Sequence, residues 1–164
     1  VPADNTLKAG ECSVTAECGK IEEEGFDKPY FIGTHAFTVN GGEISEVSIP
    51  VSLGNTIVKV ECTEGFRNYY RNWSFKLSRS GADIVAFAKD ETKAAFVDGY
   101  RFTLSGVMEA ETKTYTFNKE YSSLEPATAY TFVFDVTNTG SAAITISFNN
   151  KVETVELGDI ELND

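Results

Sequence analysis

The chain is poor in the residues on which catalytic and metal centres depend, with one His, three Cys and one Met among 164 residues. His35 is the only candidate for a general base of the usual kind, and its alternation with Phe37 and Val39 is typical of an ordinary strand residue. The sequence also lacks a Gly-x-Ser-x-Gly nucleophile elbow, a phosphate-binding loop and a dinucleotide-binding glycine pattern. Three scattered Cys and one His are too few for a zinc site. We therefore expect a protein without enzymatic activity, metal or cofactor.

Basic charge and long apolar runs are also scarce. Fourteen Lys and Arg stand against 25 Asp and Glu, and the net charge of -11 repels phosphate backbones and does not attract anionic lipid, so we expect no nucleic-acid partner. No run approaches the roughly 18 apolar residues that a membrane-spanning helix needs. The only Met is Met108, so a chain that begins at Val1 is expected to be a trimmed or mature form from which a signal segment has been removed.

The odd number of Cys excludes a complete disulfide framework, and at least one thiol is unpaired or intermolecular. Cys12 and Cys18 fall at even spacing with Val14 and Ala16, on the expected buried face of one strand. If that strand is extended, about 3.3 Å per residue separates the two thiols by roughly 20 Å, which is too far for a disulfide. Cys62 continues the buried face of another segment, so we expect all three to be buried structural thiols.

Apolar and polar residues alternate with a period of two in most of the chain, and this pattern predicts β-strands. Turn residues separate the strands, as in Asn40-Gly41-Gly42 and Ser80-Gly81. Many short strands without intervening helices predict an all-β fold, an antiparallel β-sandwich of the immunoglobulin, fibronectin type III or transthyretin-like kind. The expected strands are Glu11–Glu17, His35–Val39, Glu46–Leu53, Ile57–Thr63, Ser74–Ser78, Ile84–Ala88, Ala94–Val97, Tyr100–Ser105, Thr112–Asn118, Ala129–Thr137, Ala143–Asn149 and Glu153–Leu157.

One segment, Thr63 to Trp73, has helical spacing instead. Phe66, Tyr70 and Trp73 fall at positions i, i+4 and i+7, which lie on one face of about two helical turns. We therefore expect one short helix that caps an end of the sandwich, with these three rings turned toward the core.

Aromatic side chains also provide the candidate ligand-binding residues, because flat apolar rings with a polar rim stack well on sugars. Tyr69, Trp73 and Tyr100 would serve if they project from one end of the sandwich, although helical spacing favours burial of Trp73 over exposure. The acidic run Glu22-Glu23-Glu24 is expected to be a solvated loop rather than a catalytic or calcium site.

The stretch "LEPATAYTFVFDV" predicts a turn followed by a half-buried strand. Pro126 fixes the turn and cannot donate to a ladder, so strand pairing is expected to begin after it. The stretch resembles the Leu-x-Pro-x-Thr-x-Tyr strand start of fibronectin type III domains. That resemblance implies that Tyr130 packs at a corner and bonds through its hydroxyl to nearby backbone, which makes Pro126 and Tyr130 structural residues.

A second resemblance covers most of the chain and is strongest in "LKAGECSVTAECG" and "KPYFIGTHAFTVNGGEISEVSIPVSLGNTIVKVECTEGFRNYYRNWSFKL". These segments resemble a family of surface lipoproteins of Bacteroidetes that is related to the fimbrillins and has no established functional residues. Cys12 departs from the family pattern, which usually has Tyr there. The resemblance implies export, a lipid anchor upstream of this chain, β-sandwich modules and a role in adhesion or fimbria-like assembly. The residues that carry it are Leu7, Gly10, Pro29, Phe31, Gly33, Phe37 to Val39, Asn55, Val58, Val60, Phe66, Tyr69 and Tyr70.

Together these observations predict a non-enzymatic module for cell adhesion or fimbria-like assembly, lipid-anchored at the cell surface or outer membrane. Its partner would be another protein or a second copy, joined through an edge strand. The alternative function is a carbohydrate-binding module that accompanies a glycan-utilisation system. Residues 1–50 are interpreted as N-terminal strands, the remnant of a first sandwich module, and residues 51–164 as the main sandwich. A single domain over residues 1–164 is the alternative.

Overall fold

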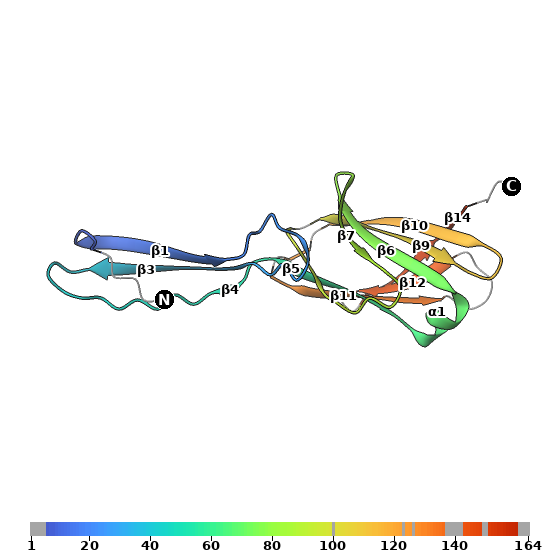
Figure 1. The fold of residues 1–164 in the computed structure, drawn as a ribbon, viewed down its shortest axis with the longest axis horizontal. Coiled ribbons are helices and arrows are strands. Elements are labelled where there is room, and N and C mark those ends of the chain that lie inside the picture. Colours follow the sequence, from blue (N-terminus) through green and yellow to red (C-terminus); the bar gives the residue numbers. More distant parts are fainter. Residues whose placement is uncertain are drawn as a thin grey trace.

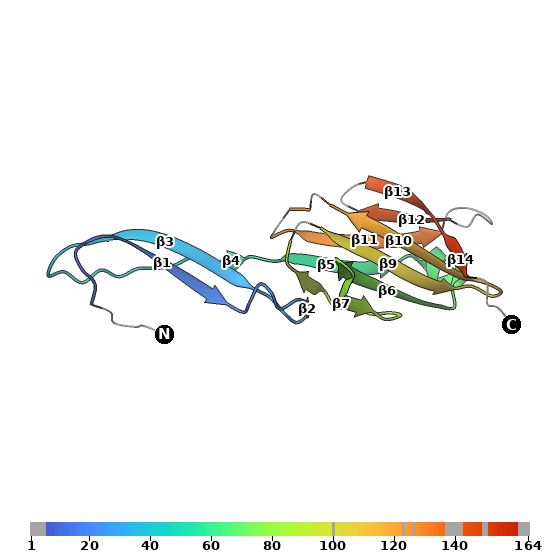
Figure 2. The same cartoon turned by 90° about the horizontal axis from the view of Figure 1, so that it is seen from above.

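The computed structural model describes residues 6–99, 101–122, 124–125, 127–136, 143–148 and 151–160. A narrow arm extends from one end of a two-sheet sandwich (Figures 1 and 2). The predicted all-β sandwich with one short helix is therefore confirmed.

Three sheets make up the described fold. The arm contains the sheet β1-β3-β4, built from β1 (Gly10–Cys18), β3 (Phe31–Val39) and β4 (Ser52–Leu53). One layer of the sandwich has the order β14-β10-β9-β6-β7, with β6 (Asn72–Arg79), β7 (Ala82–Phe87), β9 (Phe102–Glu109), β10 (Thr114–Tyr121) and β14 (Gly158–Ile160). The other has the order β13-β12-β11-β5-β8-β2, with β2 (Gly25–Phe26), β5 (Thr56–Cys62), β8 (Ala95–Val97), β11 (Ala129–Val136), β12 (Ala143–Phe148) and β13 (Lys151–Glu156).

The described strand pairings are antiparallel except that of β5 with β11, which is parallel in the register Ala129 opposite Ile57 to Phe134 opposite Cys62. We predicted an antiparallel sandwich because the helices that usually connect parallel strands are missing, and this one pair departs from that expectation. Much of the chain between β5 and β11 forms β6, β7, β9 and β10 of the opposite sheet. That sheet supplies the crossover that a helix would otherwise provide.

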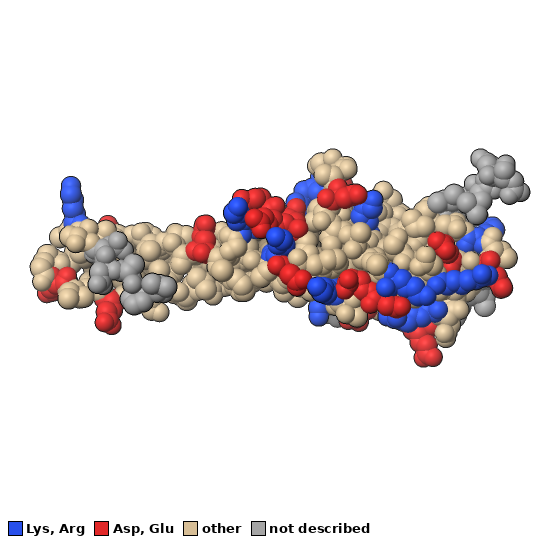
Figure 3. All heavy atoms as spheres, in the orientation of Figure 1, with Lys and Arg blue, Asp and Glu red and all other residues tan. Residues whose placement is uncertain are grey.

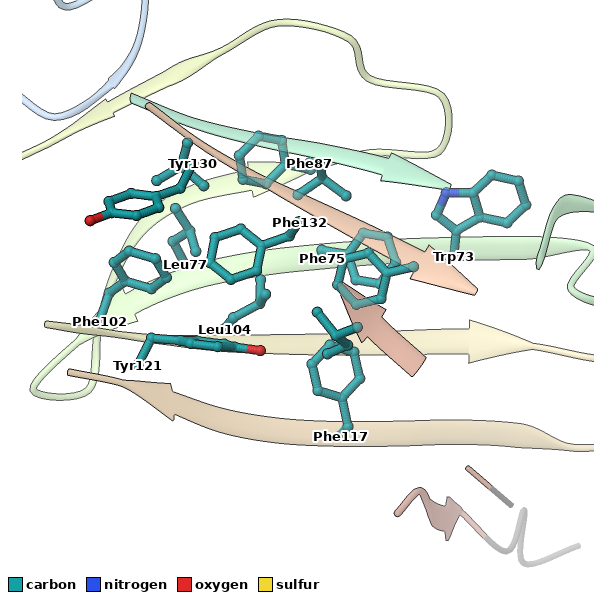
Figure 4. Close-up of a cluster of buried hydrophobic side chains, with 14 of the residues drawn as sticks. Trp73, Phe75, Leu77, Phe87, Phe102, Leu104, Phe117, Tyr121, Tyr130 and Phe132 are labelled. Carbon is teal, nitrogen blue, oxygen red and sulfur yellow. The ribbon is translucent and has the colours of Figure 1, made fainter. Parts of the chain in front are cut away.

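Side-chain alternation determines the sandwich core. Along β6, Trp73, Phe75 and Leu77 are buried, while the residues between them face solvent. Phe75 stacks on Phe134 of the opposite sheet, with ring centroids 4.0 Å apart, and Figure 4 shows the surrounding cluster of large side chains. Full burial of each such side chain stabilises the fold by about 1.5–3 kcal/mol, so these aromatic layers account for much of the sandwich's stability.

Helix α1 (Glu64–Tyr69) is shorter than predicted. Its first turn is capped by Thr63, whose Oγ1 accepts a hydrogen bond from the backbone N–H of Phe66 at 3.2 Å. The same hydroxyl lies 2.6 Å from Oδ1 of Asp135 at the end of β11. The cap therefore ties the helix to the six-stranded sheet as well as starting it.

The predicted extension of this helix to Trp73 is wrong, because the chain is already extended at Tyr70 and Trp73 belongs to β6. The three rings nevertheless pack together as expected. The ring centroid of Phe66 lies 4.6 Å from that of Tyr70 and 5.6 Å from that of Trp73. A helical turn followed by a strand thus brings the same side chains into the core by a different route.

Candidate functional site

The arm, which we define as residues 7–18 and 31–53, is the most unusual feature of the molecule. Its strands β1 and β3 pair antiparallel over nine residues each, from Gly10 opposite Val39 to Cys18 opposite Phe31. At about 3.3 Å per residue the ribbon is roughly 30 Å long. Every one of its residues is at least partly exposed. A two-stranded ribbon is marginally stable in water by itself, so the arm depends on further contacts.

One such contact comes from residues 40–51, which we call the strap. The strap returns from the arm's tip and crosses the ribbon face that carries Val14 and Ala16. Gly33 lies opposite Ala16, and a Cβ atom on Gly33 would be only 2.0 Å from the carbonyl oxygen of Pro50. The missing side chain at Gly33 therefore provides the space in which the strap passes over β3.

The strap is also where the strand prediction for Glu46–Leu53 is largely wrong. Only Ser52 and Leu53 pair with β3, as β4, and residues 44–49 make no backbone hydrogen bond with another described residue. The alternation of Val47, Ile49 and Val51 is strand-like, but the segment crosses a sheet face instead of following an edge, and Pro50 has no N–H to donate. Residues 44–49 therefore have strong strand propensity but no paired strand among the described residues.

The outer edge of β1 is open in the part of the chain that the structure describes, since β1 pairs there only with β3. Alternate backbone N–H and C=O groups of β1 therefore face solvent, which is the arrangement that accepts another strand. Glu11, Ser13, Thr15 and Glu17 are exposed on the polar face of this strand. We take the outer edge of β1 as the candidate site.

Apolar side chains are exposed on the same arm. Among the described residues, five large apolar side chains are classed as exposed, and Leu7, Ile44 and Val51 of the arm are three of them. Ile44, in the strap just after the turn at residues 40–43, is 97% exposed. In the view of Figure 3 the arm's surface is mostly uncharged, whereas charged groups gather over the sandwich and the region where the arm joins it. The arm therefore exposes apolar side chains as well as an open strand edge.

An ion pair holds the joint between arm and sandwich. Arg79 at the end of β6 donates from Nη1 and Nη2 to the two carboxylate oxygens of Glu24, at 2.9 and 3.0 Å. Glu24 also accepts a hydrogen bond from the backbone N–H of Asp98 at 2.6 Å, and Arg79 donates from Nε to the carbonyl of Arg101 at 3.1 Å. The prediction that Glu22-Glu23-Glu24 is a solvated loop is therefore wrong for Glu24, whose carboxylate accepts two hydrogen bonds from Arg79. We call the ion pair between Glu24 and Arg79 the clasp.

A buried amide completes the joint. The side chain of Asn55 donates from Nδ2 to the carbonyl of Lys28 at 2.9 Å and accepts from the backbone N–H of Tyr30 at 3.3 Å. Nearby, Phe26 of β2 packs edge-on against Phe87 of the sandwich, with ring centroids 5.3 Å apart. We expect these contacts to limit movement of the arm, so that less conformational entropy is lost when it binds a partner.

The predicted ligand-binding aromatics do not form a shared platform among the described residues. Tyr69 is 46% exposed and makes an edge contact with Tyr70, with ring centroids 4.9 Å apart. Trp73 is only 5% exposed, and the ammonium of Lys89 stands 4.8 Å from its ring centroid, so Trp73 has no open face for a sugar. Tyr100 lies outside the described residues.

Tyr130 has the structural position that the sequence predicts. Its ring is buried at the start of β11, and its hydroxyl accepts a hydrogen bond from the backbone N–H of Glu125 at 2.8 Å. The predicted bond from this hydroxyl to nearby backbone is therefore confirmed. Pro126, the other predicted structural residue, lies outside the described residues.

The residues considered for chemistry are scattered. His35 is exposed on β3, in register with Val14. Within the described residues, no three His, Cys, Asp or Glu side chains lie close enough together to hold a metal ion. In the same residues, no helix is both long and apolar enough to cross a membrane.

The three thiols differ in exposure. Cys12 and Cys62 are half-buried and Cys18 is exposed, so the prediction of a buried thiol is wrong for Cys18, the last residue of β1 at the joint. Burial raises the pKa of Cys62 to about 12. This thiol is therefore protonated and weakly reactive at neutral pH.

A shallow hollow of about 540 Å³ lies on the solvent-facing side of the five-stranded sheet, over β6, β9 and β10. Hydroxyl and amide groups of Ser74, Ser105, Thr116 and Asn118 line it. The ammonium of Lys76 also lies there and pairs with Asp83 at 3.0 Å. These groups suit hydrogen bonding to a polar ligand, although no aromatic ring is exposed among them.

An edge strand was expected from the sequence, but neither its place on β1 nor the ion pair at the base of the arm was predicted. A signal for the arm was present in "NGGEISEVSIPV", where β-branched residues follow a tight turn and Pro50 interrupts them. A proline in a strand-like run demotes it to an edge or to a non-strand segment. Nothing local distinguished Glu24 from its two acidic neighbours, because its partner Arg79 is distant in the sequence.

Comparisons with known proteins give a family but no activity. Residues 1–164 match the model of the family described as Domain of unknown function (DUF4493). No curated protein and no solved structure matches the chain.

Proposed function

Since the chain belongs over its whole length to this family of unknown function, we propose a role for it from its geometry: a non-enzymatic cell-surface module for adhesion or fimbria-like assembly. The observation that carries the proposal is the open β1 edge on an arm whose base carries the ion pair between Glu24 and Arg79. A partner strand added along β1 would satisfy the outward backbone groups and so supply affinity. The sequence resemblance to fimbrillin-related surface lipoproteins of Bacteroidetes supports the same role. It also implies that the protein is exported and lipid-anchored.

Strand addition fits this arm better than a docked helix or a loop would. The strap already covers the apolar face of the ribbon at Gly33, so the free hydrogen-bonding groups are concentrated along the edge. Partner residues would lie alongside β1 and place alternate side chains on its two faces. Leu7, which is exposed and lies three residues before β1, would add an apolar contact to the backbone bonds.

Panning a random library of extended nine-residue peptides against the whole chain tests the proposal. We expect selected peptides to protect the amides of β1 from hydrogen exchange. Because alternate N–H groups of β1 point outward, one of the variants Ser13→Pro and Val14→Pro removes an outward donor and the other a donor to β3. The variant that keeps the arm folded should lose peptide binding. Selected peptides that instead protect β7 or β13 would contradict the proposal.

A carbohydrate-binding module is the second candidate, and Tyr69 is the observation that favours it. Its exposed ring stands at one end of the sandwich, and the hydroxyl-lined hollow on the five-stranded sheet provides a separate polar surface. A glycan array followed by binding measurements on Tyr69→Ala and Ser105→Ala tests this candidate. Binding that neither substitution weakens, or an array without bound glycans, would count against it.

A further inference from the structure

We propose that the strand accepted by β1 is a basic, extended segment of a different protein, and not a second copy of this chain. The inference rests on the proposed strand-addition function and adds the chemistry of the partner. It follows from the charges beside the open edge and from the registers that two copies of β1 could adopt.

The charged side chains of β1 are Glu11 and Glu17, both exposed on the strand's polar face and six residues apart. The residues directly across the ribbon are Thr38 and Ile32, which carry no charge. No ion pair within the described residues includes either glutamate. The edge therefore presents two negative charges that the arm itself does not neutralise.

The rest of the arm also carries a net negative charge. Its other acidic residues are Glu43 and Glu46 of the strap, and its only basic residue is Lys8. Two arms brought together edge to edge would therefore repel each other, whereas a strand that carries Lys or Arg would be attracted.

Register makes the repulsion between two copies specific. If two β1 strands pair antiparallel over their full length, Val14 lies opposite Val14, and Glu11 then lies opposite Glu17 at both ends. Like charges directly opposite each other on a sheet are destabilising. A shift that places Ser13 opposite Ser13 separates the glutamates, but Cys18 and Glu17 then lose their pairing partners. Two antiparallel β1 strands can therefore keep either the full ladder or separated charges, but not both.

A basic partner strand can form the full ladder of backbone hydrogen bonds and also place opposite charges across from the two glutamates. In a nine-residue antiparallel segment, Lys at the second and eighth positions would face Glu17 and Glu11, and Val at the third, fifth and seventh would lie on the side of Ala16, Val14 and Cys12. The complementary peptide is Ser-Lys-Val-Thr-Val-Thr-Val-Lys-Ser. Opposite charges across a strand pair add to the backbone bonds and also fix the register.

Binding of this peptide to the whole chain, measured by fluorescence anisotropy in low salt, tests the inference. Replacing both Lys by Thr should weaken binding between about twofold and about tenfold, and replacing them by Glu should weaken it further. The advantage of Lys over Thr should shrink at 0.5 M salt because exposed charges are then screened. A Lys peptide with N-methyl groups on the amides that face β1 should bind far more weakly.

Matched protein variants test whether Glu11 and Glu17 cause the preference for the Lys peptide. Glu11→Gln with Glu17→Gln should abolish the preference for Lys over Thr. Glu61→Gln with Glu120→Gln removes the same number of charges from exposed positions of the sandwich and should leave the preference intact.

The outcomes separate this inference from the proposed function. Equal binding of the Lys and Thr peptides, with protection of the β1 amides, would overturn the basic partner and keep strand addition. Sedimentation showing dimers that disappear when β1 is blocked would overturn it in favour of a second copy. Lys-peptide binding that N-methylation leaves unchanged would mean non-specific attraction and overturn it. Failure of every peptide to bind or to protect β1 would overturn both strand addition and this inference.

Discussion

The clasp between Glu24 and Arg79 should determine how firmly the arm is held, and Glu24→Gln tests this at nearly constant size. The amide keeps one acceptor oxygen but places an NH₂ group against the guanidinium, so one of the two bonds from Arg79 is lost along with the charge. Hydrogen bonds to charged groups contribute about 1.5–3 kcal/mol and neutral ones about 0.5–1.5 kcal/mol. The side chains of Arg79 and Glu24 are 32% and 17% exposed, which reduces the effect. We expect the variant to be destabilised by about 1–2 kcal/mol.

Urea unfolding followed by the fluorescence of Trp73, the only tryptophan, measures this change. The matched control is Asp83→Asn, which breaks the ion pair between Lys76 and Asp83, whose side chains are 47% and 66% exposed. Surface pairs of this kind contribute roughly 0–1 kcal/mol, so the control should change stability by less than about 0.5 kcal/mol.

The direction of the arm is a second readout of the same substitution. Spin labels introduced through Ser13→Cys on the arm and Ser74→Cys on the sandwich, in a chain whose native cysteines are replaced by Ser, report the distribution of distances between the two parts. We expect a narrow distribution in the parent and a broader one after Glu24→Gln. If stability changes no more than in the control and the distribution keeps its width, the clasp does not hold the arm. A broad distribution in the parent would refute the fixed arm itself.

Three further substitutions or reactions test other parts of the structure. Tyr130→Phe removes a bonded hydroxyl and should lower the free energy of unfolding by about 1 kcal/mol in the same urea assay; no change would mean that water replaces the bond at no cost. Gly33→Ala should force the strap away from the ribbon and speed hydrogen exchange in the arm, with little effect on sandwich unfolding, whereas Gly41→Ala, which has open space, should not. Cys62 should react with iodoacetamide at pH 8 much more slowly than exposed Cys18. Its unfolded thiol ionises near pH 9 and the folded thiol near pH 12, so stability should fall as the pH rises above about 9. Equal alkylation rates would contradict the burial of Cys62.

Most strands were predictable because period-two alternation is a local signal that burial on one face imposes. The short strands β2 and β14 were missed, since each has a single large apolar residue, whereas the similarly short β8 was predicted within Ala94–Val97. The residues from Glu46 were predicted as a strand from the same signal, and the structure uses most of them as a strap. Alternation indicates that one side of a segment is buried. It does not show whether the segment pairs with a neighbouring strand or lies across the face of a sheet.

The candidate site was less predictable than the fold. Tyr130 could be assigned because its hydroxyl bonds to backbone only a few residues away. The open edge of β1 depends on which strands lie beside it, and the clasp depends on Arg79, which is far from Glu24 in the sequence. Trp73 was a ligand candidate on its chemistry, and its packing against Phe66 removes it from the surface.

The sequence by itself determined that this is an acidic, nearly helix-free sandwich with an aromatic core, because composition and side-chain alternation act through local geometry and hydrophobic burial. The tertiary structure decided that residues 7–18 and 31–53 leave the sandwich as an arm, that β5 and β11 run parallel, and that Glu24 is a clasp. The physical reason is that burial, strand pairing and ion pairing between distant segments depend on where the chain returns in space, and no local pattern encodes that return.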